Sequence, residues 1–386
     1  MTASLGRAVR RTAVIVSIHF LLLITPGALA APEAVGGNTE LRVHIVAEGL
    51  QSPWALAFLP DARMLVTERA GRMRIVDADG RVSAPLQGVP RVHAQGQGGL
   101  LDVVLGPEFE RDRTIFFSYA EATPNGARTA VARAELDLSG MRLRSVRRIF
   151  AQNDDPGGGH HFGSRLVLGA DGMLFVTLGD RNQMRERSRR LDSHLGKIVR
   201  ISPDGSVPED NPFVGRRGAL DEIWTYGHRN VQGAALHPDS GELWIHEHGP
   251  RGGDEVNIIR AGADYGWPDV THGRSYVTRL PFGEATEREG VEAPVHYWVP
   301  TSIAPSGMAF YTGDAIPEWR GDLFVGALAS RKLVRLELDG ERVVAEHALL
   351  EDMGSRIRDV RMGPDGHLYV LDESRGRILR LEPGER

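Results

Sequence analysis

The sequence predicts an all-β protein, a six-bladed β-propeller with loop insertions between its blades. Two observations lead to this prediction. One pattern of a turn and a strand occurs six times in the same order along the chain. The 46 glycines fall mostly in short clusters typical of turns, which favours many short strands over long helices. Because one blade cannot bury both of its faces, neighbouring units must stack into a ring.

The repeated pattern joins a turn rich in Pro, Asp or Gly to a strand of mainly apolar residues. Its clearest copies are ADGMLFV at 170–176 and PDGHLYV at 364–370. The six predicted strands are, in order, 64–67, 113–117, 173–176, 243–245, 323–325 and 368–370. A further strand candidate follows several copies, at 73–76, 333–336 and 378–381.

The spacing between copies is uneven, and it is longest from the fourth copy to the fifth. We therefore expect long insertions between the third and fifth copies, and functional residues on those insertions. A pair of β-sandwiches with accidental repetition is the alternative. It is disfavoured because the turn precedes the strand in every copy.

Composition places the chain among ordinary globular proteins and argues against several functional classes. It has 386 residues, of which 41% are hydrophobic and 25% charged. A net charge of -5 gives no electrostatic basis for binding nucleic acid. There is no cysteine, which excludes cysteine nucleophiles, thiolate metal sites and covalently attached c-type haem. Since β-rich folds can be long, we expect one domain over residues 31–386.

Residues 1–30 are predicted to be a secretory signal peptide that is cleaved after Ala30. The segment combines a positive region, a mostly apolar run and a small-residue cleavage site, namely Arg7, Arg10 and Arg11, residues 13–24, and Ala28–Ala30. An uncleaved membrane anchor is the alternative, but the apolar run is short for a spanning helix. No later segment is apolar enough to span a bilayer. We therefore expect an exported protein, periplasmic or secreted, using the Sec or the twin-arginine route.

The most polar part of the chain is the segment from Glu222 to Asn257. It places many hydrogen-bonding groups among glycines around one short apolar strand. The Gly249-Pro250 pair removes one backbone donor and leaves carbonyl oxygens that suit a hard cation. A polar turn between two strands is the alternative interpretation.

A glycine-rich segment at 95–100 carries Gln97. No helical pattern follows it, so a phosphate-binding loop is disfavoured. A glutamine held on such a turn can reach the carbonyl of a planar ligand. A tight turn without function is the alternative.

Two adjacent histidines, His160 and His161, form a candidate for proton transfer. Adjacent residues of a strand point to opposite faces, so at most one of them faces a given site. A neutral histidine is the usual general base near pH 7. Asp180 is expected at the end of the next strand, where its carboxylate would fix the imidazole tautomer and raise its basicity. A surface or core histidine is the alternative.

Near the C-terminus, Arg356 and Arg358 are expected to share one face of a strand. Two guanidinium groups on one face repel each other unless an anion lies between them. The pair therefore indicates a ligand that carries carboxylates. A solvated basic edge is the alternative.

With these residues in place, the chain resembles the soluble aldose sugar dehydrogenases of the glucose/sorbosone dehydrogenase family, which use pyrroloquinoline quinone (PQQ). The resemblance covers nearly all of the predicted mature chain. It rests on motifs in the order of the family, namely PWALAF at 53–58, GQGGLLD at 96–102, HFGSR at 161–165, LGK at 195–197, YGHRN at 226–230, EHGPRGGDE at 247–255, YGWP at 265–268 and RIRDV at 356–360. The family fold is a six-bladed propeller, in agreement with the repeat.

The resemblance implies roles for individual residues. It implies His161 as the general base, Asp180 as its paired carboxylate, and Arg229 as the group that stabilises charge on the quinone oxygen. The cofactor-binding residues that it implies are Gln97, Arg229, Asn230, Arg356 and Arg358, with the more loosely aligned Tyr276, Tyr297 and Ser302 and the loop residues Ala327, Leu328, Ala329 and Lys332. It implies Gly249 and Pro250 as carbonyl ligands of a catalytic calcium, and Glu255 and Tyr265 as part of a second, structural calcium site.

One position departs from the family pattern. Relatives often have a lysine directly after the Ala-Leu pair of the fifth-blade loop, and here Ala329 occupies that position. Lys332 or Arg331 is expected to replace the missing charge.

The activity implied by the resemblance is the oxidation of an aldose at its anomeric carbon to a lactone. Hydride transfer to PQQ would be followed by electron transfer to an external acceptor, with calcium as the second cofactor. A calcium-dependent lactonase is one alternative, although it would need carboxylates and Asn side chains around a central calcium. A binding propeller without catalysis is another. The preferred sugar and the acceptor stay open, as does the choice between monomer and dimer.

Overall fold

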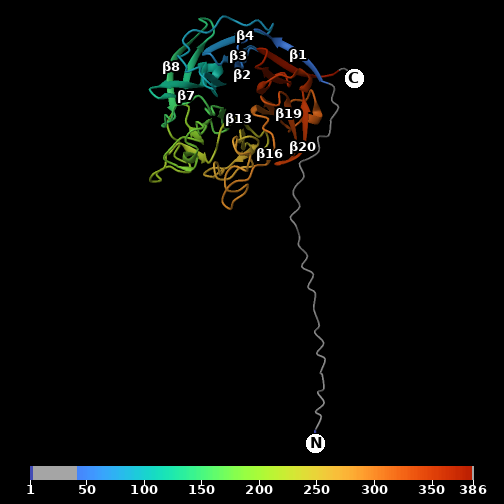
Figure 1. Ribbon diagram of the computed structural model, residues 1–386. Helices are drawn as coiled ribbons and strands as arrows, with labels where there is room; N and C mark the ends of the chain where they lie inside the picture. The colour runs from blue at the N-terminus through green and yellow to red at the C-terminus, as the bar shows by residue number, and fades with distance from the viewer. Residues whose placement is uncertain (3–40, 385–386) are drawn as a thin grey trace. The chain divides into compact units, whose positions relative to one another are not determined.

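The computed structural model describes residues 1–2 and 41–384. Residues 41–384 form six antiparallel sheets arranged as the blades of a propeller (Figure 1). The predicted all-β six-bladed propeller is thereby confirmed. The predicted cleavage site at Ala30 and nearly all of the predicted signal peptide lie outside the described residues. Within the described ranges, no helix is both long and apolar enough to cross a membrane.

Each blade is built from strands that follow one another in the chain. The first blade has three strands, β2 (Pro53–Phe58), β3 (Met64–Glu68) and β4 (Arg72–Val76). The second contains β5 (Leu100–Leu105), β6 (Thr114–Thr123), β7 (Gly126–Asp137) and β8 (Arg142–Ala151). The third contains β9 (Leu166–Leu168), β10 (Leu174–Thr177), β11 (Lys197–Ile201) and β12 (Ile223–Tyr226).

The fourth blade contains β13 (Val231–Leu236), β14 (Leu243–Glu247), β15 (Asp254–Ile259) and β16 (His296–Trp298). The fifth contains β17 (Pro305–Phe310), β18 (Leu323–Ala327), β19 (Leu333–Asp339) and β20 (Arg342–Leu349). The sixth contains β21 (Ile357–Met362), β22 (Leu368–Asp372) and β23 (Arg377–Pro383). Helical structure among the described residues is limited to α1 (Phe109–Asp112) and short 3-10 turns at Arg185–Arg189, Pro317–Trp319 and Glu351–Met353.

The ring is closed by the first strand of the fold. Strand β1 (Leu41–Ala47) pairs antiparallel with β23 and becomes the outermost strand of the sixth blade. Its register places Leu41 opposite Pro383 and Val43 opposite Leu381. The two ends of the propeller are thus held in one sheet, which leaves β23 without a free edge.

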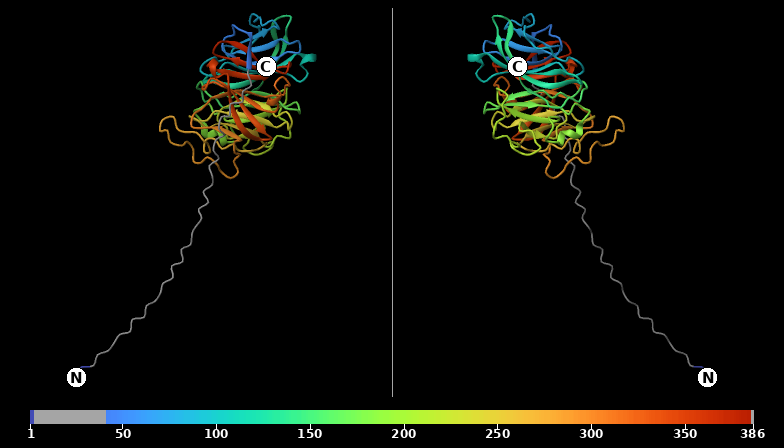
Figure 2. Two further views of the ribbon diagram at one scale, coloured as in Figure 1. Left: turned by 90° about the vertical axis from the view of Figure 1, so that its right-hand side faces the viewer. Right: turned by 90° about the vertical axis from the view of Figure 1, so that its left-hand side faces the viewer.

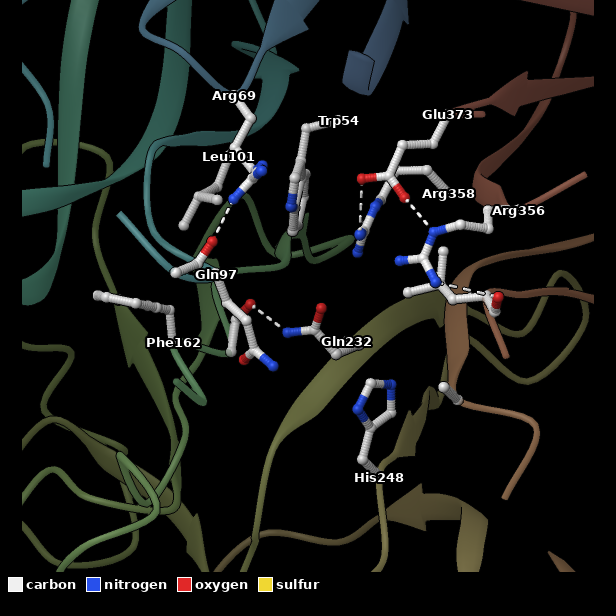
Figure 3. Close-up of a pocket in the computed structure, with 14 residues that line it drawn as sticks. Trp54, Arg69, Gln97, Leu101, Phe162, Gln232, His248, Arg356, Arg358 and Glu373 are labelled. Atoms are coloured by element: carbon white, nitrogen blue, oxygen red, sulfur yellow. Dashed lines mark hydrogen bonds and ion pairs between the residues drawn. The ribbon is translucent and has the colours of Figure 1, made fainter. Parts of the chain in front are cut away.

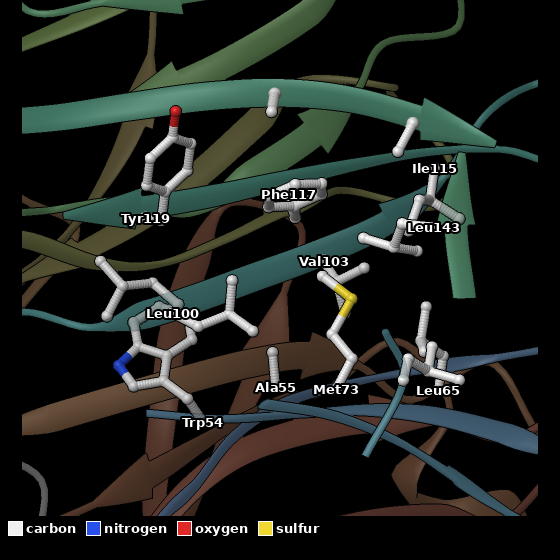
Figure 4. Close-up of a cluster of buried hydrophobic side chains, with 14 of the residues drawn as sticks. Trp54, Ala55, Leu65, Met73, Leu100, Val103, Ile115, Phe117, Tyr119 and Leu143 are labelled. Carbon is white, nitrogen blue, oxygen red and sulfur yellow. The ribbon is translucent and has the colours of Figure 1, made fainter. Parts of the chain in front are cut away.

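The repeated sequence pattern corresponds to the second strand of every blade, which is β3, β6, β10, β14, β18 or β22. All residues of β3, β14, β18 and β22 are buried. Because neighbouring blades cover both faces of these strands, they read as continuous apolar runs and not as alternating ones. Figure 4 shows this packing between the first two blades, where Trp54, Leu65 and Met73 lie against Val103 and Phe117.

The longest loop belongs to the fourth blade. Residues 260–295 connect β15 to β16 and project from the body of the propeller, as the orange loops of Figure 2 show. Tyr276, Val277 and Leu280 on this loop are exposed. This placement agrees with the long insertions expected between the third and fifth copies of the repeat.

Candidate active site

A polar cavity of about 320 Å³ lies where the inner ends of the blades meet (Figure 3). All six blades contribute to it, through their strands or through the loops next to them. Its charged and polar side chains are Arg69, Gln97, Gln232, His248, Arg356, Arg358 and Glu373, and its other lining residues are Trp54, Gly96, Leu101, Phe162, Gly163, Ala304 and Leu328. The three arginines face only one carboxylate in this lining. The cavity is therefore suited to an anionic ligand.

Several of the lining side chains come from β-bulges. The first strands of the blades lie next to one another around the centre, and register shifts occur near the starts of β2, β5, β13 and β21. The residues inside these shifts include Trp54, Leu101, Gln232 and Arg358, and all four line the cavity. A bulge leaves one residue unpaired and changes the direction of its side chain. The bulges thus turn side chains from inner strands toward the ligand space.

His161 and Asp180 form a buried pair. The Nδ1 atom of His161 lies 2.6 Å from Oδ1 of Asp180. The expected contact between these residues is therefore present, but the expected local structure was wrong. His160 and His161 precede β9 in a loop, and His161 has a left-handed φ of 52°. Only His161 is buried and His160 is exposed, because the loop and not a strand decides their directions.

The carboxylate of Asp180 is fully engaged. Its Oδ2 accepts a hydrogen bond from Nε1 of Trp267 at 2.9 Å, and its Oδ1 also accepts one from the backbone N–H of Asn182 at 2.7 Å. Burial opposes ionisation, but the hydrogen bond from His161 and the nearby Arg229 lower the pKa of Asp180 below its usual value. An ionised Asp180 accepts only, so it holds the proton of His161 on Nδ1 and leaves Nε2 as an acceptor.

The protonation state of His161 follows from its surroundings. Burial and the charge of Arg229 together lower the pKa of His161 to about 4, although Asp180 opposes both effects. The imidazole is therefore neutral near pH 7. A neutral imidazole with a free Nε2 can accept a proton.

Gln97 connects this pair to the cavity. Its Oε1 accepts a hydrogen bond from the backbone N–H of His161 at 2.8 Å, and its own N–H donates to the Gly159 carbonyl at 2.7 Å. Gln97 itself is one of the residues that line the cavity (Figure 3). The glycine-rich loop is followed by β5 and not by a helix, as the sequence predicted.

Arg229 and Asn230 lie immediately behind the cavity lining. Arg229 donates from Nη1 to the carbonyl of His248 at 2.9 Å, and its backbone N–H donates to Oε2 of Glu247 at 2.5 Å. The guanidinium carbon lies 5.3 Å from the ring centre of Trp267. Oδ1 of Asn230 accepts from the N–H of Gly163 at 3.2 Å. His161, Asp180 and Arg229 are thus brought together around Trp267.

Arg356 and Arg358 share a partner that the sequence interpretation missed. Nε of Arg356 and Nη2 of Arg358 each lie 3.0 Å from a different oxygen of Glu373. The anion expected between the two arginines is thus supplied at least in part by the protein. Burial opposes ionisation of Glu373, but both arginines lower its pKa. Nε of Arg358 is buried and has no hydrogen-bond partner in the described chain, so this cluster retains an unused donor.

The Gly249-Pro250 turn is held by Asp254. Oδ1 of Asp254 accepts from the N–H of Gly249 at 2.9 Å, and Oδ2 accepts from the hydroxyl of Ser302 at 2.6 Å. Asp254 therefore joins the turn to the segment that precedes β17. The Pro250 carbonyl accepts one hydrogen bond, from the N–H of Arg274 at 2.7 Å. Since a carbonyl oxygen has two lone pairs, it retains one for a cation.

Glu255 and Tyr265 line a second cavity of about 390 Å³. Its other lining residues include Glu287, Glu289 and Glu292. Burial raises the pKa of Glu255 well above its usual value, and the nearby Glu247 adds to this effect. The Tyr265 hydroxyl donates to the Ile258 carbonyl at 2.7 Å and accepts from the Arg260 N–H at 2.9 Å. Among the residues that the structure describes, no group of three His, Asp or Glu side chains is arranged to hold a metal ion.

The remaining expected residues differ in their relation to the central cavity. Leu328 lines it, and its carbonyl accepts from Nη1 of Arg356 at 3.1 Å. The other expected cofactor residues outside the lining are Tyr276, Tyr297, Ser302, Ala327, Ala329 and Lys332. Tyr276 is 60% exposed, and Tyr297 stacks on His272 with ring centres 3.8 Å apart.

The charge expected from Lys332 or Arg331 does not reach the cavity lining. Nζ of Lys332 lies 3.7 Å from Oε1 of Glu351, and Nη1 of Arg331 donates to the Gly354 carbonyl at 3.5 Å. The further arginine of the lining is Arg69, which the sequence interpretation did not select. Trp54 lay within a quoted motif and Gln232 within the polar segment from Glu222 to Asn257, but Arg69 and Glu373 carried no local signal.

The chain matches a known family model and is similar to a known protein over most of its length. The family model described as Glucose / Sorbosone dehydrogenase matches residues 50–380. The chain is 46% identical to the aldose sugar dehydrogenase YliI of Escherichia coli strain K12 over 367 residues, which cover 94% of this chain and 97% of that protein.

Two solved structures are also similar to this chain over most of its length. The soluble aldose sugar dehydrogenase from Escherichia coli in the apo-form is similar with a TM-score of 0.86 at 46% identity, covering 89% of this chain and 100% of that one. The PQQ-bound aldose sugar dehydrogenase from Streptomyces coelicolor is similar with a TM-score of 0.74 at 31% identity, covering 91% and 99% of the two chains.

Proposed function

From the premise that the chain belongs to the glucose/sorbosone dehydrogenase family, a family of oxidoreductases, we propose that it oxidises aldoses at the anomeric carbon to lactones with PQQ as its cofactor. The observation that carries the proposal is the His161–Asp180 pair beside Arg229, directly behind a cavity rich in arginine. Such a site offers a proton acceptor, a fixed positive charge and room for an anionic cofactor.

The central cavity fits PQQ in its charge and its donors. PQQ carries carboxylates, and three arginines and one glutamate line the cavity. The buried Nε of Arg358 has no partner in the described structure and would gain one from such a ligand. We assign Arg356 and Arg358 to the cofactor carboxylates, and Gln97 and Asn230 to its edge. The PQQ-bound relative from Streptomyces coelicolor supports PQQ as the cofactor.

We assign the Gly249 and Pro250 carbonyls to the catalytic calcium, because calcium prefers oxygen ligands and the Pro250 carbonyl accepts a single hydrogen bond, from Arg274. When bound, PQQ would accept the hydride of the sugar and calcium would polarise the quinone. A second calcium at Glu255 and Tyr265 would neutralise the half-buried carboxylate of Glu255. The Tyr265 hydroxyl is used within the protein, so this residue would contribute through its backbone.

In this proposal, Nε2 of His161 takes the proton of the anomeric hydroxyl. Asp180 keeps the imidazole in the required tautomer and stabilises the imidazolium that forms. Arg229 provides a fixed positive charge next to the reacting groups, and such a charge is worth ~3 kcal/mol in the barrier. Trp267 keeps the side chains of Asp180 and Arg229 in place, because it donates a hydrogen bond to Asp180 and its ring packs against the guanidinium of Arg229.

The same proposal places the protein outside the cytoplasm, periplasmic or secreted, since residues 1–30 have the pattern of a signal peptide. Electrons would then leave to an external acceptor.

The alternative activities fit the site less well. A calcium-dependent lactonase would need several carboxylates around a central ion. Glu373 is the carboxylate in the described cavity lining, and two arginines already hold it. A binding propeller would have no use for the His161–Asp180 pair.

One experiment tests the proposed function. The purified mature protein is supplied with PQQ and calcium, and several aldoses are assayed with an artificial dye as electron acceptor. We expect cofactor uptake and turnover of at least one aldose, with formation of its lactone. Absence of both uptake and turnover would refute the proposal.

A further inference from the structure

We propose that Arg69 is a third guanidinium that binds the anionic cofactor, at a carboxylate which Arg356 and Arg358 do not hold. This inference rests on the proposed function, because it concerns the same cavity. It assigns a ligand-binding role to a residue outside the family motifs quoted above. It also replaces the expectation that Lys332 or Arg331 supplies a further charge.

Arg69 is the lining arginine without a carboxylate partner. Its side chain donates from Nη1 to the Gly96 carbonyl, and no ion pair is formed by it within residues 41–384. Arg356 and Arg358 differ, since each contacts Glu373. A guanidinium has five N–H donors. The single protein acceptor therefore leaves Arg69 with unused donors and an uncompensated charge beside the cavity.

The closed ring brings Arg69 to this position. Arg69 directly follows β3 in the first blade, whereas Arg356 and Arg358 belong to the sixth, and the first strands of these two blades are neighbours. In the view of Figure 3, Trp54 lies between Arg69 and Arg358. The guanidinium carbon of Arg165 lies 4.1 Å from the ring centre of Trp54, and this contact holds the indole in place.

The separation of the arginines defines the ligand that they suit. A small monocarboxylate would be held by Arg356 and Arg358 alone. Arg69, on the other side of Trp54, adds a positive charge that a small anion at that pair would not use. A planar anion with carboxylates on more than one edge would use both groups, and PQQ, which has three carboxylates, is of this class. Bidentate guanidinium contacts favour such carboxylates.

The test compares two substitutions that separate charge from hydrogen bonding. Arg69→Lys keeps the positive charge, and Arg69→Gln keeps a donor for the Gly96 carbonyl without the charge. The calcium-loaded full mature chain is titrated with PQQ, and binding is followed by quenching of tryptophan fluorescence. We expect Arg69→Gln to raise Kd by about tenfold or more and Arg69→Lys by less than about threefold. Binding to Arg69→Gln should also depend less on salt concentration.

Arg331→Gln is the matched control, because it removes an arginine that contacts Gly354 and does not line the cavity. Its Kd should equal that of the wild type. Equal Kd values for Arg69→Gln and wild type would overturn the inference. Equal losses in Arg69→Gln and Arg69→Lys would also overturn it, because the variant that keeps the positive charge would then bind PQQ no better than the variant that lacks it. Thermal unfolding of each apoprotein reports whether the fold is intact. Wild type that binds no PQQ would instead overturn the proposed function, and this inference with it.

Discussion

His161 and Asp180 meet through a 2.6 Å hydrogen bond between Nδ1 and Oδ1, although neither belongs to a regular strand. Asp180 also accepts from Trp267 and from the backbone of Asn182. The imidazole is thus held by a carboxylate that is itself held from two sides. This relationship fixes which nitrogen of His161 is free to take a proton, and the first two predictions depend on it.

Removal of the proposed base should abolish turnover while the cofactor still binds. We expect His161→Ala to lower kcat by about two to four orders of magnitude. Asp180→Asn should have a similar effect, because an amide can donate to Nδ1 and would place the proton on Nε2. Steady-state kinetics after reconstitution, together with a PQQ titration, measure both. Near wild-type kcat in fully loaded His161→Ala would rule out its assignment as the base.

The pH dependence of kcat/KM should have an acidic limb near pH 4. The pKa of His161 is about 4 in the folded protein because of burial and Arg229, so the base is deprotonated at every higher pH. Activity should rise as pH increases through about 4 and then level off with respect to this group. An acidic limb near the ordinary histidine value of 6.5 would contradict this.

The same shift predicts a contribution to stability. The folded pKa of His161 lies below its ordinary value of 6.5, so the unfolded chain binds the proton more readily between pH 4 and 6.5. The free energy of unfolding should therefore decrease as pH falls through this window. In His161→Gln this part of the decrease should be absent, which denaturant titrations at pH 7 and pH 5 can measure.

Glu373 should stabilise the apoprotein and weaken the binding of an anion. Glu373→Gln leaves Arg356 and Arg358 without their shared carboxylate. We therefore expect the free energy of unfolding of the apoprotein to fall by about 2 kcal/mol. Because a negative charge is removed beside the cavity, PQQ should bind more tightly. Denaturant unfolding and fluorescence titration measure the two effects.

Glu351→Gln is the control for Glu373→Gln, since Glu351 pairs with Lys332 away from the cavity lining. Glu351→Gln should leave both the free energy of unfolding and the Kd for PQQ unchanged. Weaker PQQ binding by Glu373→Gln would show that arrangement of the arginines outweighs the charge of Glu373.

Calcium should raise thermal stability through Glu255. Its half-buried carboxylate lies close to Glu247, so a bound cation relieves an unfavourable charge. We expect calcium to raise the Tm of the wild type by several degrees and that of Glu255→Gln by much less, as measured by calorimetry with and without chelator. An equal calcium response in both proteins would argue against a site at Glu255.

Closure of the ring by β1 should be needed for stability. Removal of residues 41–47 exposes the edge of β23 and takes away Leu41 and Val43, which pack against the core of the fifth and sixth blades. We expect a chain that begins at residue 48 to melt about 10 °C lower than one that begins at residue 41. Equal melting temperatures would show that closure by β1 is dispensable.

The sequence by itself determined the architecture and much of the chemistry. Each blade is encoded by a local turn and a second strand that neighbouring blades bury on both faces, so the six copies could be read without knowing where the blades lie. The contact between His161 and Asp180 could be predicted from the sequence for a related reason. Both residues flank strands of one blade, and antiparallel neighbours bring such ends together.

Only the tertiary structure decided how the blades share the central cavity. Arg69 and Arg358 are far apart in the chain and line one cavity because the ring places the first blade beside the sixth. Glu373 follows β22, and no local pattern relates it to the arginines near the start of β21. The directions of Trp54, Gln232 and Arg358 depend on bulges, which a strict two-residue alternation does not predict. Local patterns specify strands because turns and burial act over a few residues, whereas contacts in the cavity depend on ring closure and on irregular register.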